Sequence, residues 1–218
     1  MAPLILGATV EAACETLARH GIEVQGAVLE PDGGGGQTEA LAHAMRAWRA
    51  DLAIGAPPNA VALAGAADCS VLVLPEPFAR RCRVPPQRIF VASDGSAASA
   101  IAVREAARVA AAGAAVRVGY LACDPVKARH PEDFDAVVLE RPPNELQHEG
   151  ASISREIVEA ALQWHADLLV LGTRGGHEGA RWRFGSVAAD VARRTVLPLM
   201  LVPQTVGYSA FSAVSSIH

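Results

Sequence analysis

A five-residue segment that occurs twice constrains the fold of this chain more than any other feature. Trp-Arg-Ala-Asp-Leu at residues 48–52 recurs as Trp-His-Ala-Asp-Leu at residues 164–168. Each copy ends an amphipathic pattern typical of a helix and enters an apolar run typical of a strand. Both runs then reach a glycine, Gly55 or Gly172. Because the copies lie much further apart than the repeats of a solenoid, they predict two domains of one fold.

Strand and helix patterns alternate along both parts of the chain, which predicts the α/β class with parallel sheets and right-handed crossovers. In the first part we expect strands at 4–8, 23–29, 51–55 and 70–74, helices at 10–20, 38–49 and 59–67, and a loop at 33–36. In the second part we expect strands at 88–93, 115–122, 167–172 and 198–202, and helices at 97–112, 152–165 and 186–195. The prolines between residues 122 and 152 predict an irregular stretch there.

The segment from Glu76 to Gln87 carries three prolines and three arginines, which is typical of a linker. We therefore expect a first domain at residues 1–80, a second domain at residues 87–204 and a C-terminal tail at residues 205–218. The sequence leaves open whether this nearly uncharged tail packs on a neighbouring chain or is disordered.

Composition limits the partners that the chain can have. Hydrophobic residues make up 51% of the sequence but aromatic residues only 5%, so Ala, Val and Leu must fill the core, as suits parallel strands covered by helices. The net charge of -4 argues against binding of nucleic acid, which calls for a basic surface. Without a basic leader or an apolar run of about 18 residues, we expect a cytoplasmic protein with no membrane span. The four widely spaced cysteines form no metal-binding motif.

Residues 172–186 form a glycine-rich segment between a strand pattern and a helix pattern. Glycines let backbone N–H groups approach a ligand, and a helix N-terminus adds unpaired donors and partial positive charge. The segment therefore predicts a site for a polyanion, and we place Ser186 as the N-cap of the helix that follows. It is neither a Walker A loop nor a Rossmann fingerprint, because no Gly-Lys-Ser/Thr closes it and its glycine spacing differs.

The spacing of Gly172, Gly175 and the pair Gly185-Ser186 resembles the nucleotide-binding signature of the ATP-binding branch of the universal stress protein family. Residues 88–99, with Asp-Gly-Ser after a strand pattern, resemble the opening strand and turn of that family. Together the two motifs are much more specific than one. The resemblance covers the second half well, apart from the proline-interrupted residues 124–150.

This resemblance implies a fold, a ligand and a role. The fold would be two tandem doubly wound parallel-sheet domains of the universal stress protein type, which is like that of the adenine-nucleotide α-hydrolases. Each domain would have a five-stranded order with the ligand at the switch point. The ligand would be ATP, with or without Mg²⁺, and the role that of a stress-response or regulatory module.

The residues that would hold the nucleotide follow from the resemblance and from their positions at strand ends. Asp94 would bond adenine or ribose, although it could also cap the next helix together with Ser96 or Ser99. Leu121 and Ala122 would contact adenine, but core packing explains them equally well. Arg174 could reach a phosphate or stay solvated. The full expected set is Ser93, Asp94, Leu121, Ala122, Gly172, Arg174, Gly175, Gly185, Ser186 and Val187.

The first half lacks the features that carry this chemistry. Its segment from Gly55 to Pro75 is eleven residues shorter than the segment from Gly172 to Pro203, and it has no Gly-Ser pair. Its first strand ends in Gly-Ala-Thr, where the matching strand of the second half ends in Ala-Ser-Asp. We therefore expect a degenerate, structural first domain and one ATP per chain.

The sequence assigns no catalytic residue. Phosphoryl transfer needs a positioned nucleophile and cation clamps, and the sequence has no Walker lysine, no carboxylate pair beside the glycines and no recognisable Ser-His-Asp set. Any ATP hydrolysis should be slow, and metal binding stays open because Asp94 alone is a weak basis for a Mg²⁺ site. Two other functions stay open: an ATP-using enzyme of the adenine-nucleotide α-hydrolase type, and an interaction scaffold without nucleotide.

The final strands of the two halves, at residues 70–74 and 199–202, bear on assembly. In the family that the chain resembles, such strands commonly pair with those of a partner, and an unpaired apolar edge favours association. The two strands could pair with each other as a pseudo-dimer or leave an edge for a second chain. We expect a homodimer, because the short first half predicts imperfect internal pairing.

Overall fold

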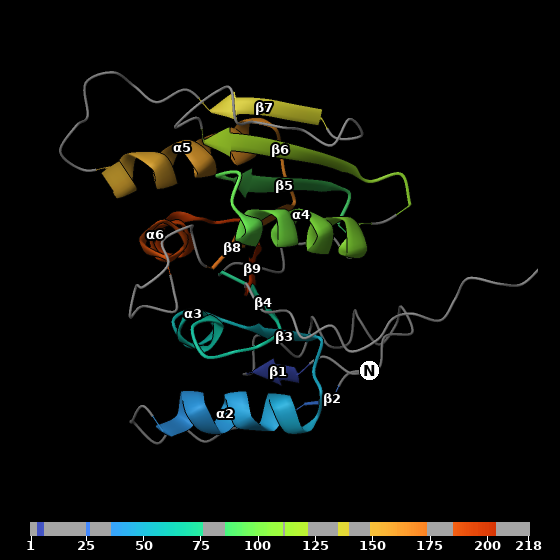
Figure 1. The fold of residues 1–218 in the computed structure, drawn as a ribbon, viewed down its shortest axis with the longest axis vertical. Coiled ribbons are helices and arrows are strands. Elements are labelled where there is room, and N and C mark those ends of the chain that lie inside the picture. The colour runs from blue at the N-terminus through green and yellow to red at the C-terminus, as the bar shows by residue number, and fades with distance from the viewer. Residues whose placement is uncertain are drawn as a thin grey trace, which may run out of the picture.

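The computed structural model describes residues 4–6, 25–26, 36–75, 86–110, 112–121, 135–139, 149–173 and 185–203. These residues form one nine-stranded sheet with helices on both faces (Figure 1). The strands are β1 (Leu4–Leu6), β2 (Gln25–Gly26), β3 (Leu52–Gly55), β4 (Ser70–Val73), β5 (Arg88–Ser93), β6 (Ala115–Leu121), β7 (Asp135–Leu139), β8 (Leu168–Gly172) and β9 (Leu199–Val202). The helices are α2 (Gly36–Ala47), α3 (Asn59–Ala64), α4 (Ala97–Val109), α5 (Glu149–Gln163) and α6 (Ser186–Arg194). The expected helix at 10–20 and the tail at 205–218 lie outside the described residues.

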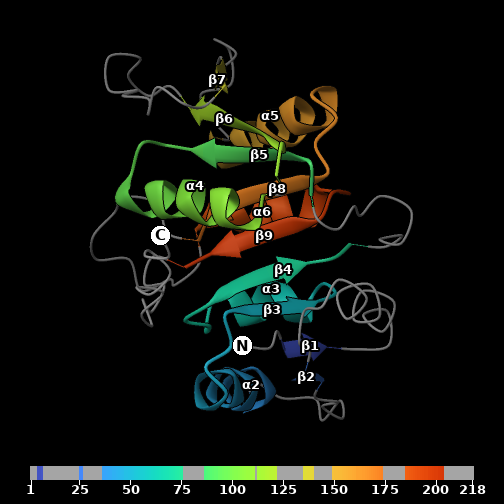
Figure 2. The ribbon, with the colours of Figure 1, turned by 90° about the vertical axis from the view of Figure 1, so that its right-hand side faces the viewer.

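The strand order is β2-β1-β3-β4-β9-β8-β5-β6-β7, and every neighbouring pair is parallel except β4 and β9. Strands β9-β8-β5-β6-β7 have the five-stranded doubly wound order expected for the second half. In the middle of the sheet β4 and β9 run antiparallel, with Leu72 opposite Met200 (Figure 2). The sheet is therefore mixed, although parallel pairs dominate, and strands from both halves of the chain belong to it.

One strand lies where the sequence predicts irregular structure. Residues 135–139 form β7, which pairs in parallel with β6 over its whole length. Pro131 and Pro142 flank this strand and do not interrupt it. The expectation of an irregular stretch was wrong because the run Asp-Ala-Val-Val-Leu is too short to show a period. Its valines suit a pleated surface, and β6 supplies the ladder that local sequence cannot reveal. The helix after it, α5, also begins earlier than expected, at Glu149.

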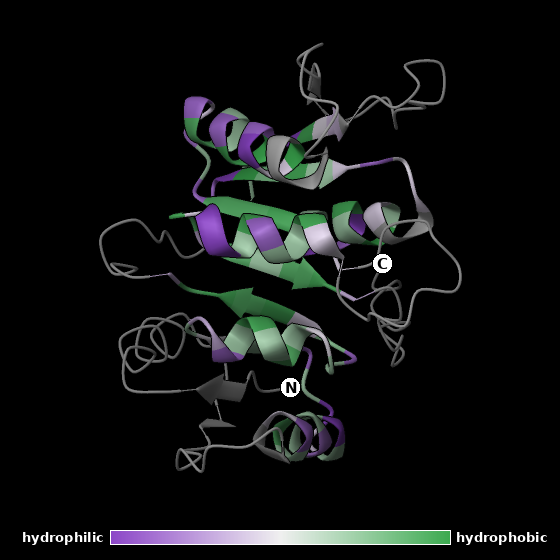
Figure 3. Cartoon of the chain, turned by 90° about the vertical axis from the view of Figure 1, so that its left-hand side faces the viewer, coloured by the Kyte–Doolittle hydropathy of each residue, from purple (hydrophilic) through white to green (hydrophobic). Residues whose placement is uncertain are grey.

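Helices cover both faces of the sheet, which explains why its central strands are apolar along their whole length (Figure 3). On one face α4 packs over β5, β8 and β9. Its buried cluster contains Ile89, Val91, Ala102, Ala106, Leu168, Val170, Met200 and Val202, with the first-half residues Leu52 and Leu72 packed against it. On the other face, residues of α2, α3, α5 and α6 share a second cluster around Phe90, Leu169 and Leu199. Both layers of the core thus continue across the pairing of β4 with β9.

The repeated segment forms the same turn in both halves. Arg49 and His165, the second residues of the two copies, have φ angles of 50° and 55°, in the left-handed region. The alanines that follow, Ala50 and Ala166, each donate their N–H to the carbonyl five residues earlier at 2.9 Å. These are the positive φ and the six-residue hydrogen bond of a Schellman motif, which ends a helix. The repeat therefore encodes one type of passage from helix to strand.

The aspartate of the second copy also fixes the neighbouring strand. The Asp167 carboxylate accepts hydrogen bonds from Gln87 N at 3.0 Å and Arg88 N at 2.9 Å. Asp167 N donates in return to Arg88 O at 2.9 Å. Because these groups lie where β5 begins, Asp167 sets the register of the strand whose other end bears the first candidate site residues.

None of the helices in the described parts of the chain is both long and apolar enough to cross a membrane. The longest of them, α5, has 15 residues, whereas a transmembrane helix needs about 20.

Candidate functional site

Strands β5 and β8 lie side by side, and the helices that follow them cover opposite faces of the sheet. Ala92 near the end of β5 pairs with Leu171 near the end of β8. Residues of α4, which follows β5, belong to the core cluster on one face, and residues of α6, which follows β8, belong to the cluster on the other. In doubly wound sheets, ligands bind outside the carboxyl ends of the strands at such a switch point. The carboxyl ends of β5 and β8 therefore lie where a ligand is expected.

The turn after β5 is held by its own polar groups. Asp94 is exposed, and its Oδ1 accepts a hydrogen bond from Ser96 N at 2.9 Å. Gly95 has a φ of +78°, and nothing lies within 4 Å of the position that a Cβ would take. Glycine is therefore required here for its backbone conformation and not for space. Ser96 is the N-cap of α4, because its hydroxyl accepts from Ser99 N at 3.2 Å. Asp94 braces the turn, and the capping role falls to Ser96.

Ser93 lies beneath this turn and supports it. Its side chain is buried, and its hydroxyl donates to Ser99 Oγ at 3.0 Å while accepting from Gly95 N at 3.2 Å. The Ser99 hydroxyl in turn donates to Ser96 O at 2.9 Å. Ser93 was expected among the ligand contacts. Its hydroxyl is used inside the protein and positions the Asp94 turn, and a ligand contact through its backbone stays a prediction.

The two ends of the glycine-rich segment are joined. Gly185 N donates to Thr173 O at 2.7 Å, and Thr173 N donates to Val202 O at 2.9 Å. Thr173 is buried and continues β8 beyond its last assigned residue. Sequence reasoning missed Thr173, although its place between Gly172 and Arg174 marks it as the start of the loop. Arg174 and Gly175 lie outside the described residues.

Helix α6 begins at residue 186, as expected, but its N-cap is a glycine and not the expected serine. Its N-cap is Gly185, with φ −68° and ψ 144°, and Ser186 is already the first helical residue. The prediction of Ser186 as the N-cap was therefore wrong. The physical reason is that Gly185 is held extended by its bond to Thr173, and its carbonyl accepts the first helical hydrogen bond, from Ala189 N at 3.0 Å. The N-cap glycine has no side chain that could accept from the first N–H groups of the helix.

The remaining expected residues lie at different depths. Gly172 and Val187 are half-buried, and Val187 packs against the core, so only its backbone could meet a ligand. Ser186 is exposed at the start of α6. Leu121 is the last residue of β6, at the same edge of the sheet, and pairs with Leu139. Ala122 lies outside the described residues.

The described groups at this edge suit binding more than proton transfer. They comprise the Asp94 carboxylate, the Ser186 hydroxyl and backbone N–H groups. The strongly shifted pKa values belong to other places: burial raises the pKa of the Cys69 thiol to about 12, and hydrogen bonds lower that of Asp190, in the second turn of α6, to about 2. Within the described residues, no group of three or more His, Cys, Asp or Glu side chains could hold a metal ion.

Comparisons with known proteins agree with this architecture. Residues 86–203 match the model of the universal stress protein family. A candidate universal stress protein from Pseudomonas aeruginosa is 14% identical, with a TM-score of 0.56 over 92% of this chain and 81% of its own. A universal stress protein from Archaeoglobus fulgidus is 12% identical, with a TM-score of 0.54 over 89% of this chain and 76% of its own. At these identities the likeness shows the fold alone. No curated protein is significantly similar in sequence.

Proposed function

Because the chain belongs to the universal stress protein family, we propose that it serves a stress response by binding an adenine nucleotide at the carboxyl edge of β5 and β8. Membership of the family supports the stress-response role. ATP is the proposed ligand, and the site lies in the second half, residues 87–204. No catalytic residue is assigned, so any ATP hydrolysis would be slow and secondary to binding.

The convergence of two separate sequence signatures carries this proposal. The exposed Asp94 turn follows β5, and both ends of the glycine-rich segment, Thr173 and Gly185, lie beside the neighbouring strand. Asp94 would accept hydrogen bonds from the ribose or from adenine. The uncapped amides of α6 and the Ser186 hydroxyl would donate to phosphate oxygens, with Arg174 and Gly175 completing that side. A hydrogen bond to a charged group contributes about 1.5–3 kcal/mol, so a few of these suffice for binding.

The described start of α3, the counterpart of α6 in the first half, differs from α6 in its backbone donors, which supports one nucleotide per chain. Gly55 pairs with Val73 as Gly172 pairs with Val202, so these glycines hold matching places in the sheet. After Gly55 come Ala-Pro-Pro, and Pro58 is the N-cap of the short helix α3. Proline has no N–H group. Pro57 and Pro58 therefore offer no backbone donor, and the Ala60 N–H is already used, since it donates to Ala56 O at 3.1 Å.

The order of the described strands supports two tandem domains of one type. In the first half it is β2-β1-β3-β4, which matches β6-β5-β8-β9 in the second half. We propose on this basis that residues 1–80 are a degenerate copy of residues 87–204. A cytoplasmic location remains a prediction, and the homodimer expected from the sequence is to be tested against the pseudo-dimer of a single chain. Since β4 pairs with β9 inside the chain, a second chain would have to use another surface.

Two other functions remain testable. An ATP-using enzyme would need acid, base or nucleophile groups beside the nucleotide, and those described at this edge are a carboxylate, a hydroxyl and backbone amides. An interaction scaffold would carry no nucleotide at all. Nucleotide that remains with the purified protein, seen as excess absorbance near 260 nm, would favour the proposal over a scaffold.

Isothermal titration calorimetry with ATP, with and without Mg²⁺, tests the function directly. We expect one ATP per chain, and a stoichiometry near two would contradict the single site. The variant Asp94→Asn keeps an oxygen for the Ser96 amide but removes the charge, so we expect several-fold weaker binding. The matched control is Asp68→Asn, an exposed aspartate in the first half that pairs with Arg46, and it should bind like the wild type. Absence of ATP binding by the wild type would overturn the nucleotide function.

A further inference from the structure

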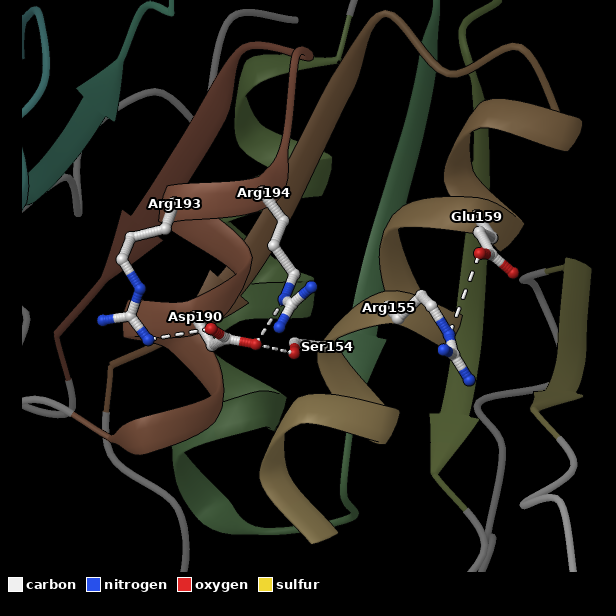
Figure 4. A network of polar contacts seen from close by, with 6 residues as sticks. All are labelled: Ser154, Arg155, Glu159, Asp190, Arg193 and Arg194. Carbon is white, nitrogen blue, oxygen red and sulfur yellow. Dashed lines mark hydrogen bonds and ion pairs between the residues drawn. The ribbon is translucent and has the colours of Figure 1, made fainter. Parts of the chain in front are cut away.

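A polar cluster ties α6 to α5 through one carboxylate. Asp190 of α6 accepts hydrogen bonds from the Ser154 hydroxyl of α5, from Arg193 Nη2 at 2.8 Å and from Arg194 Nε (Figure 4). Ser154 is completely buried, whereas the Asp190 side chain is 14% exposed. We call these four residues the α6 anchor. Of its contacts, the one from Ser154 joins two helices, and the two from the arginines stay within α6.

The carboxylate of this anchor is charged under all ordinary conditions. The Ser154 hydroxyl, followed by Arg194 and Arg193, holds the pKa of Asp190 at about 2. A hydrogen bond between a hydroxyl and a carboxylate is short, directional and roughly twice as strong as one between neutral groups. The two arginines offset the negative charge of Asp190, so it subtracts little from the partial positive charge at the start of the same helix.

Directional contacts matter because the apolar contacts of α6 are small. Its buried residues are Ala188, Val191 and Ala192. Two methyl groups, the Val191 side chain and the half-buried Val187 can pack nearly as well after a small rotation or shift of the helix, since the hydrophobic effect is not directional. The Ser154 contact fixes the rotation of α6 about its axis. Gly185, bonded to Thr173 O, fixes its first residue.

We propose that Ser154 and Asp190 are positioning residues that aim the first turn of α6 at the phosphate groups of the ligand. This inference rests on the proposed nucleotide function. It divides the site by chemistry: the anchored α6 turn serves the polyphosphate, and the Asp94 turn, held separately by Ser93 and Ser99, serves the nucleoside. A loss of the anchor should therefore weaken binding of the polyphosphate and leave binding of the nucleoside unchanged.

Calorimetry of Ser154→Ala with ATP and with adenosine tests this division. Alanine keeps the volume of the buried site nearly unchanged and removes the bond between the helices. We expect ATP affinity to fall about tenfold, whereas adenosine affinity stays within about twofold of the wild type. A purely structural role would weaken both ligands alike, and that result, or unchanged ATP affinity, would overturn the proposal. Asp190→Asn, which keeps the shape of the acceptor, should show the same selectivity with a smaller loss.

Glu159→Gln is the matched control on the same helix. Glu159 is 58% exposed, forms an ion pair with Arg155 at 3.9 Å and does not belong to the anchor (Figure 4). The control should bind both ligands like the wild type. Amide hydrogen exchange separates this inference from the proposed function. Even if the wild type binds no nucleotide, Ser154→Ala should speed several-fold the exchange of the Ala189 amide, which closes the first turn of α6 on Gly185 O. Exchange of the Ala100 amide, which closes the first turn of α4 on Ser96 O, should stay unchanged. An unchanged rate at Ala189, or an equal rise at both amides, would overturn the positioning role.

Discussion

The two tryptophans of the repeat have different surroundings although their backbones match. The guanidinium carbons of Arg88 and Arg117 lie 4.5 and 5.0 Å from the ring centre of Trp164, with Phe90 in contact on another side. Arg88 also donates to Trp164 O at 3.0 and 2.6 Å. Trp48 is 46% exposed. The Trp164 ring is therefore covered by cationic side chains, whereas the Trp48 ring is largely exposed.

The strand registers explain this difference. Phe90 pairs with Arg117 in the second half, and Leu4 pairs with Gln25 at the matching place in the first. In the sequence, Ala2 stands two residues before Leu4 as Arg88 stands two residues before Phe90. Neither replacement carries a cation that could lie over an indole ring. Both copies of the repeat form the helix-ending turn, but arginine side chains lie over the tryptophan of the second copy alone.

Leucine substitutions should show this asymmetry in stability. We expect Trp164→Leu to lower the free energy of unfolding by about 2–3 kcal/mol, because it removes cation–π contacts and leaves a cavity beside Phe90. Trp48→Leu should change it by less than about 0.5 kcal/mol, as is usual for exposed positions. Urea unfolding of both variants measures the difference. Equal losses would mean that the arginines contribute nothing to the Trp164 site.

Two glycines with positive φ provide a second comparison between single residues. Gly95 has φ +78° and Gly113 has φ +80°, and both have open space at the Cβ position. Alanine at either place should therefore cost about 1–2 kcal/mol of stability through backbone strain alone. Only Gly95→Ala should also weaken ATP binding, because Gly95 shapes the Asp94 turn, whereas Gly113 lies in the turn before β6. Calorimetry and urea unfolding of the pair would show it, and equal ATP affinity in both variants would speak against the site.

A helix or strand could be predicted from the sequence where its apolar pattern is long enough to show a period or is bounded by clear linker and turn residues. The sequence predicts β5 at its observed bounds, 88–93, because its apolar run is flanked by a linker and a polar turn. It also predicts which strand ends share an edge, and so brings Asp94 and Gly172 together. It could not predict β7, whose hydrogen bonds come from β6. The N-cap of α6 was missed for a similar reason, since the bond from Gly185 to Thr173 spans the loop. The burial of Ser93 depends on contacts with Ser99 that no local rule contains.

The contact between α5 and α6 makes stability depend on pH in a defined range. The pKa of Asp190 is lowered from 3.8 to about 2 on folding, so its contribution is fully present above about pH 4 and disappears as pH falls through 2. The shift corresponds to about 2 kcal/mol. Wild type should exceed Asp190→Asn in unfolding free energy by about this amount at pH 7, and the gap should narrow at pH 3. The control Asp68→Asn, in an exposed pair, should differ from wild type by less than about 0.5 kcal/mol. A gap that is constant with pH would contradict the assignment.

At the scale of the whole molecule, the pairing of β4 with β9 removes the reason for expecting a homodimer. Both final strands are used within the chain, and the core continues across them on both faces. A further hydrogen bond joins the two halves, because Ser70 Oγ of β4 donates to the Glu105 carboxylate of α4 at 3.4 Å. These contacts favour the pseudo-dimer, which the sequence left open as the alternative.

Light scattering should therefore give a mass near 22.7 kDa, that of one chain. The measurement at tens of micromolar protein decides between the two assemblies. A mass twice as large would restore the homodimer and would direct attention to a surface other than the edges of β4 and β9. The variant Val71→Pro, which removes a ladder hydrogen bond to Leu201 between the halves, should destabilise the protein without changing its mass.

Because β4 and β9 belong to one chain, their pairing does not depend on the concentration of the protein. Two separate chains that pair through an edge strand come apart when they are diluted below their dissociation constant. Strands joined within one chain experience an effective local concentration that reaches the millimolar range and does not change with the number of molecules. Even in a cell that makes only a few copies of this protein, β4 and β9 would therefore stay paired in every molecule.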